Sequence, residues 1–235
     1  MDSQDFYNQE SEQYSQKRYD GQINSYVKYF FNQRLNLVLT MLNRISKGRS
    51  DMSLLEVGCA DGVVLRQTKR TLSEKFTRLV GVDIAENMIA RARILSVGMG
   101  IEFFSKNQTL NEKFHTILLV GFMTGPLIEL ERAYVNEHLK DGGYAIISLA
   151  GRHSLQARLK LQDKPYLADY RTYREYRELL EKNFEIINTQ YYGLVIPKLW
   201  RFPKLARFLQ PALDSIGTFL FPELMHEVLY LLRKK

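Results

Sequence analysis

The chain has 235 residues, of which 45% are hydrophobic and 25% charged, and it carries a net charge of +7. This length and balance predict one globular domain with a sizeable core, and no apolar run approaches the ~18 residues that a membrane-spanning helix needs. The polar N-terminus is unlike a secretory signal, and a single cysteine, Cys59, excludes an intrachain disulfide. We therefore expect a cytoplasmic protein. Its positive charge is compatible with nucleic acid, anionic lipid, anionic small molecules or merely a solvated surface.

The predicted elements alternate along the chain. Residues 1–25 are rich in Gln, Asn, Ser and Tyr and predict an N-terminal arm. Apolar residues recurring at spacings of three and four predict helices at 23–45, 62–76, 86–97, 127–139 and 173–182. Short apolar runs predict strands at 53–57, 79–82, 101–104, 114–120, 144–149, 184–191 and 228–232. This alternation indicates a doubly wound α/β fold with a mostly parallel seven-stranded sheet, helices on both faces and an antiparallel last strand.

Two stretches of this single domain, 151–171 and 192–222, do not fit the alternation, and we expect them to form a substrate cover. The second contains an apolar helical stripe with Lys204 and Arg207 opposite it: Leu199, Phe202, Leu205, Ala206, Leu209 and Leu213. One interpretation is an interfacial helix on anionic lipid, a peripheral membrane contact. The other, which the sequence favours, is a stripe that packs on the sheet or in a dimer contact. Pro203 argues against a single straight helix.

The strongest local signal covers residues 54–62, where an apolar strand runs into a turn of small residues and then a helix, LLEVGCADG. Small residues there allow close approach of a ligand to the backbone, at the edge of an α/β sheet where ligands bind. The nicotinamide-binding fingerprint requires glycine at three positions, which here are Gly58, Ala60 and Val63, so two fail. The phosphate loop of nucleoside triphosphatases is absent.

The stretch resembles the first motif of class I, Rossmann-like S-adenosylmethionine-dependent methyltransferases of the small-molecule or lipid type. Glu56, Gly58 and Gly62 match that motif, while Ala60 replaces its middle glycine. Asp83, at the end of the second strand, resembles the acid that binds the ribose hydroxyls in this family, although an alternative is a simple helix cap. The resemblance, over about residues 19–149, implies S-adenosylmethionine as cofactor and a cofactor site at Tyr19, Glu56, Gly58, Cys59, Ala60, Gly62, Asp83, Ile84, Met88, Asn107, Val120 and Gly121.

No catalytic constellation is evident. His153 follows the fifth strand and is a candidate general base, although a surface or packing role is favoured. No histidine pairs with a cysteine or carboxylate at metal-ligand spacing, so we predict no metal site. We expect methyl transfer to a small-molecule or lipid-like acceptor. The alternatives are an RNA-directed methyltransferase, which lacks a supporting motif here, and a non-catalytic protein that binds S-adenosylmethionine. The oligomeric state stays open.

Overall fold

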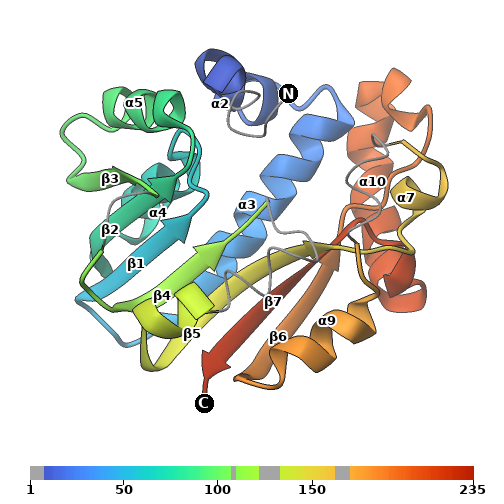
Figure 1. Cartoon of the computed structure of the whole chain (residues 1–235). Coiled ribbons are helices and arrows are strands. Elements are labelled where there is room, and N and C mark those ends of the chain that lie inside the picture. The colour runs from blue at the N-terminus through green and yellow to red at the C-terminus, as the bar shows by residue number, and fades with distance from the viewer. Residues whose placement is uncertain (1–7, 107–109, 122–132, 162–169) are drawn as a thin grey trace.

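The computed structural model describes residues 8–106, 110–121, 133–161 and 170–235. It contains a seven-stranded sheet of order β3-β2-β1-β4-β5-β7-β6 (Figure 1). The neighbouring pairs among β1 to β5 are parallel, whereas β7 is antiparallel to both β5 and β6. The predicted fold class is therefore confirmed. The strands are β1 Met52–Val57, β2 Phe76–Asp83, β3 Ile101–Ser105, β4 Phe114–Leu119, β5 Leu139–Ala150, β6 Phe184–Tyr192 and β7 Glu227–Lys234.

Helices cover both faces of this sheet, and Figure 1 shows α3 behind it and α9 in front of it. Alternate strand residues face opposite sides, so Leu54 and Leu79 pack in the cluster that includes α3, α4 and α5, while Leu55 and Val80 pack in the cluster that includes α9. Both clusters are buried, which explains why the central strands are mostly apolar on both sides. The helices and turns are η1 Ser11–Gln13, α2 Tyr14–Arg18, α3 Tyr26–Ile45, α4 Val63–Leu72, α5 Glu86–Leu95, α7 Leu155–Arg158, α9 Tyr173–Leu180, η2 Leu199–Arg201, α10 Pro203–Leu220 and η3 Pro222–Leu224.

The element boundaries differ from the prediction in three places. The helix expected over 62–76 ends at Leu72, and Phe76 instead begins β2. The strand expected to begin at residue 144 begins at Leu139, so residues 140–143 lie within β5, at an irregularity in its pairing with β4. Part of the helix expected at 127–139 falls outside the described residues, but 133–138 are helical. Strand pairing decides these boundaries, and helical periodicity does not report it.

The segment 192–222 also differs from the prediction. Pro203 is the first residue of α10, a position where its missing N–H leaves nothing unpaired, so it starts the helix. The helix then continues for 18 residues, through Pro211. The predicted stripe does not pack as one face, because Phe202 and Leu205 are exposed while Leu209 and Leu213 are half-buried. Within the described ranges, no helix has the length and apolar character to cross a membrane.

Candidate active site at the carboxyl edge of the sheet

The three strands that carry the sequence motifs end at the same edge of the sheet. Val57 of β1 pairs with Val82 of β2 on one side and with Leu119 of β4 on the other. The residues that follow these strands therefore lie together, which brings Gly58 and Asp83 to one place. This is the edge at which open α/β sheets bind ligands.

The turn after β1 has an unusual backbone. Gly58, Ala60 and Gly62 all have positive φ, at 71°, 47° and 79°. Ala60 stands where the related motif has glycine, and its left-handed conformation costs roughly 1–2 kcal/mol. At Gly62 a Cβ atom would lie 2.7 Å from the Phe103 ring, so this position requires glycine for space as well as conformation. Strain of this kind concentrates at functional sites.

Asp83 holds this turn in place. Its Oδ2 accepts a hydrogen bond from the Ala60 backbone N–H at 2.8 Å, and its Oδ1 accepts one from Ala85 N–H at 2.9 Å. Burial raises the pKa of the Asp83 carboxyl, and these backbone donors oppose that rise. Asp83 thus anchors the turn after β1 and the turn before α5. It is not the helix cap of the alternative interpretation, because the N-cap residue of α5 is Ala85 and this end of the helix has no side-chain cap. An ionised carboxylate has about four acceptor sites, so these backbone donors leave acceptor capacity for a ligand.

Glu56 is a buried acidic residue at this edge with one carboxylate oxygen that has no hydrogen bond. It is only 3% exposed, and its Oε2 has no hydrogen bond. Burial raises its pKa well above the usual range; the charge of Arg34 opposes that rise, and nearby Asp83 adds to it. A buried carboxylate with an unused acceptor is expected to have a hydrogen-bonding partner in the working protein. The arrangement fits a cationic ligand and disfavours a phosphate.

The N-terminal arm lies against this turn, and Figure 1 shows α2 beyond the tip of β1. The Tyr14 side chain packs on a small buried cluster formed by Ala60, Ala85 and Met88. The Ser15 hydroxyl donates to the buried Asp61 carboxylate. The arm therefore covers two residues of the predicted cofactor site, Ala60 and Met88.

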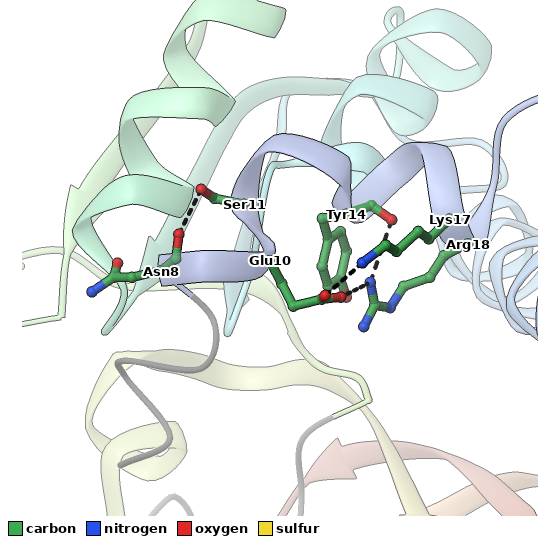
Figure 2. A network of polar contacts seen from close by, with 6 residues as sticks. All are labelled: Asn8, Glu10, Ser11, Tyr14, Lys17 and Arg18. Atoms are coloured by element: carbon green, nitrogen blue, oxygen red, sulfur yellow. Dashed lines mark hydrogen bonds and ion pairs between the residues drawn. The ribbon is translucent and has the colours of Figure 1, made fainter. Parts of the chain in front are cut away.

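A surface network stiffens the arm itself (Figure 2). Glu10 accepts hydrogen bonds from Lys17 Nζ at 2.7 Å and from Arg18 Nη1 at 3.2 Å. The Lys17 hydrogen bond is the largest cause of the lowered pKa of Glu10. The Arg18 guanidinium also lies 4.2 Å from the centre of the Tyr14 ring. These contacts hold Tyr14 over the small buried cluster.

A second polar group lies deeper, on α3. The side chain of Arg34 is 5% exposed, and its Nη1 lies 3.8 Å from Glu227 Oε1. Its guanidinium stacks over the Phe31 ring at 4.4 Å. It also packs against Gly121, where an added Cβ would lie 2.5 Å from Nη1. Arg34 therefore links the helix before β1 to the end of β4.

The remaining predicted residues differ in exposure. Ile84 is 42% exposed and follows Asp83 in the chain, whereas Cys59 is buried. Burial raises the pKa of the Cys59 thiol well above its usual range, so it is not a reactive thiolate. His153 is exposed. Asn107 lies outside the described residues. Val120 and Tyr19 are at least half-buried.

His115 links neighbouring strands and lies away from the candidate site. It lies at the amino end of β4, at the opposite edge of the sheet, and its Nδ1 is 3.0 Å from the Ser53 backbone nitrogen and 2.9 Å from the Ser53 hydroxyl. Its Nε2 is 3.1 Å from Lys140 Nζ. Burial, followed by the Lys140 charge, lowers its pKa, which favours the neutral ring. His115 is therefore a structural link between strands.

Two residues of this edge were not predicted from sequence. Asp61 lies inside the quoted motif, but its burial depends on the arm, which no pattern places there. Arg34 falls on the apolar stripe of α3, three or four residues from Phe30, Phe31 and Val38. An arginine on this apolar stripe was the sequence signal that could have identified Arg34 as a functional candidate, because a charged residue on a buried face needs a partner.

A substitution at Gly58 separates backbone strain from ligand contact. Gly48 has almost the same φ, 70°, with nothing within 4 Å of an added Cβ. We expect Gly58→Val and Gly48→Val to lose similar stability, about 1–2 kcal/mol, from the left-handed backbone. Only Gly58→Val should lose binding of S-adenosylhomocysteine, measured by calorimetry. Normal binding by Gly58→Val would place the ligand elsewhere.

Comparison with known proteins agrees with this geometry. The fold and the edge site define a Rossmann-like methyltransferase. A family model described as a methyltransferase domain matches residues 30–182, so the chain belongs to that family. The class I S-adenosylmethionine-dependent enzyme expected from the sequence is thereby confirmed. No curated protein sequence matches the chain.

Three solved structures share the fold. Magnesium protoporphyrin IX methyltransferase from Synechocystis PCC 6803, with bound S-adenosylhomocysteine, is 16% identical, with a TM-score of 0.68 over 99% of this chain and 98% of that chain. The plantazolicin methyltransferase BamL is 20% identical, with a TM-score of 0.56 over 86% and 84%. A methyltransferase from Thiobacillus denitrificans is 12% identical, with a TM-score of 0.53 over 86% and 91%.

Proposed function

We propose that this protein transfers a methyl group from S-adenosylmethionine to a small, partly apolar or lipid-like acceptor in the cytoplasm. The observation that carries the cofactor site is the buried Glu56 oxygen, Oε2, that has no hydrogen bond, beside the strained turn. The cofactor is a cationic amino acid joined to a nucleoside without phosphate. Glu56 would bind its ammonium group, Asp83 its ribose hydroxyls and Ile84 its adenine.

The acceptor side of the proposal depends on the aromatic groups near Arg34. The Tyr19 and Phe31 rings meet edge-on at 5.5 Å, and Phe30 stacks on Tyr192 at 5.4 Å. Aromatic side chains with a few polar groups among them are the residues that bind apolar molecules and fix their orientation. We propose that the arm and the segments 151–171 and 192–222 complete the enclosure as a cover.

The chemistry places modest demands on the chain. S-adenosylmethionine supplies an electrophilic methyl group when bound. The chain's residues must then align the acceptor and exclude water, which the arm does by packing on the cluster of Ala60, Ala85 and Met88. A strong general base is optional for such a reaction, and the exposed His153 is not required.

The acceptor class is tested with the full chain and S-adenosylmethionine labelled in the methyl group. Separate reactions receive a total lipid extract, an aqueous metabolite extract and total RNA. We expect label in material that partitions into organic solvent, and none above background in RNA. Label confined to RNA would overturn the proposed acceptor while leaving methyl transfer intact. The Gly58→Val variant serves as the inactive control.

The raised pKa of Glu56 predicts that ligand binding releases a proton. The free protein holds a proton on Glu56 at pH values where an ordinary glutamate, with a pKa of about 4.3, is ionised. A ligand ammonium favours the ionised form, so affinity for S-adenosylhomocysteine should increase as pH rises through the raised pKa. Because the pKa of Glu56 is higher in the folded protein than in the unfolded chain, its contribution to the stability of the free protein is largest at low pH. That contribution declines as the pH rises through the raised pKa.

The measurement is calorimetry in buffers of different ionisation enthalpy, which counts protons released. Glu56→Gln should bind more weakly and lose the Glu56-dependent part of the proton release. The exposed Glu74→Gln is the matched control. Identical proton release in Glu56→Gln and the unmodified protein would remove Glu56 from the ligand site.

A further inference from the structure

Helix α10 has its polar side inward. Its buried residues are Ala206, Gln210, Asp214 and Gly217, which form one stripe at spacings of four, four and three. A surface helix normally turns its apolar stripe to the core and its polar face to water. Here the inner face is small and polar, so the apolar residues of the same helix must lie elsewhere.

Hydrogen bonds hold the helix in this orientation. Asp214 Oδ2 accepts from the Tyr29 hydroxyl at 2.7 Å and from Gln33 Nε2 at 2.9 Å, both on α3. Its Oδ1 accepts from the Leu194 backbone N–H at 3.0 Å. The Gln210 amide donates to the Leu194 carbonyl at 2.6 Å. Rotating α10 to bury its apolar face would leave these buried groups unpaired, which costs about 1–3 kcal/mol for each.

The outer face is correspondingly apolar. Phe208 is 80% exposed and Phe219 is 85% exposed, and they are the most exposed of a set that runs along the helix and just beyond each end. An exposed patch of this extent marks a surface for binding or membrane contact. The set comprises Phe202, Leu205, Phe208, Ile216, Phe219, Leu220 and Phe221.

Positive charge accompanies this face. Arg201, Lys204 and Arg207 are exposed around the N-terminal half of α10, and the one acidic residue of the helix, Asp214, is buried. The same three cations line a hollow of about 560 Å³ together with apolar side chains that include Ile23 and Phe202. Rings and cations at one surface match acyl chains and lipid phosphates, whereas a second copy of this chain would add further positive charge.

The position of α10 relative to the active site is informative. Because β7 is antiparallel to both β5 and β6, β6 ends at the same edge as β5, and α10 follows β6. Asp214 connects α10 to α3, the helix that also carries Arg34. Figure 1 shows α10 beside the upper part of α3. A surface in contact with the outer face of α10 would therefore lie near the edge that carries the motifs.

We propose that α10 docks the protein on an anionic lipid bilayer, with its outer face inserted at the interface and its basic residues on lipid phosphates. The inference goes beyond methyl transfer, since docking requires neither the cofactor nor turnover. It supplies a reason for an apolar helix that is fixed by polar contacts to face outward. This role differs from the interpretation favoured by the sequence, in which the stripe packs on the sheet or in a dimer contact.

The test is co-sedimentation of the full chain with vesicles of phosphatidylcholine alone or with 30% phosphatidylglycerol, a composition we choose, at about 0.1 M salt. Two variants address the two parts of the surface, and each has a control that makes the same change at exposed positions elsewhere. The apolar variant is F208Q/F219Q with control I94Q/V97Q, and the charge variant is R201Q/K204Q/R207Q with control R44Q/K47Q/K182Q.

We expect binding to anionic vesicles only, reduced at least about tenfold in the apolar variant. The charge variant should lose roughly a hundredfold, because each basic residue near an anionic surface contributes about 1 kcal/mol. Both controls should bind as the unmodified chain does. Affinity for S-adenosylhomocysteine should be equal in all five proteins, which separates docking from the cofactor site. Two results would overturn the proposal. One is that the unmodified chain does not bind anionic vesicles. The other is that the unmodified chain forms a dimer in sedimentation equilibrium and the F208Q/F219Q substitutions dissociate it.

Discussion

Asp83→Ala should lower affinity for S-adenosylhomocysteine by about 2–4 kcal/mol, since two charge-assisted hydrogen bonds to the ribose are lost. The structure adds a second effect. The backbone N–H groups of Ala60 and Ala85 both donate to this carboxylate. Leaving them unpaired in a buried turn should reduce the free energy of unfolding by about 1–3 kcal/mol. Calorimetry and chemical denaturation measure the two effects separately.

A ligand change distinguishes ribose binding from a purely structural role of Asp83. An analogue of S-adenosylhomocysteine that lacks both ribose hydroxyls should bind the unmodified protein weakly. Asp83→Ala should bind the analogue and the parent ligand with similar affinity, because the partner of the hydroxyls is already gone. If Asp83 only holds the turns at Ala60 and Ala85, the substitution would weaken both ligands equally, and the ribose assignment would fail. Glu74→Ala, at an exposed position, is the control.

Much of the fold follows from sequence because the sheet buries both faces. Strands such as β1 are buried at every residue and are mostly apolar, and the helices between them keep a regular period. The segments at 72–76 and 139–143 were misjudged for a different reason. Pairing with a neighbouring strand decides where β2 and β5 begin, and pairing is a non-local property. A local pattern cannot report it.

The same difference between local and non-local properties decides which residues of the candidate site could be predicted. Asp83 and the turn at 58–62 were identified because their chemistry is local, in a strand, a turn and a helix. Asp61 and Arg34 were missed because their burial requires the arm and Glu227, which lie 46 and 193 residues away along the chain. The orientation of α10 could not be predicted from the sequence either. The apolar pattern was visible, but the side that packs inward is decided by the partners of Asp214.

Arg34→Met should lower the free energy of unfolding by about 3–5 kcal/mol at pH 7. The methionine retains contact with the rings of Phe30 and Phe31, so the loss comes from charge. Glu227, which also accepts a hydrogen bond from the Tyr192 hydroxyl, would be left buried without its cation. Glu56 would lose the positive charge that opposes the rise in its pKa. Denaturant unfolding of the variant and the unmodified protein measures the difference.

The pH dependence and a double substitution identify the cause. The variant should recover stability as pH falls, since protonation of the uncompensated carboxyls removes the buried charge. Replacing both partners, as Arg34→Met with Glu227→Gln, should restore a large part of the loss, because no unpaired charge is left at Glu227. A double variant that is destabilised by the sum of the two single changes would show that Arg34 and Glu227 do not interact. In that case Arg34 would stabilise the fold by packing against the aromatic rings and Gly121, and the explanation by paired charges would be wrong.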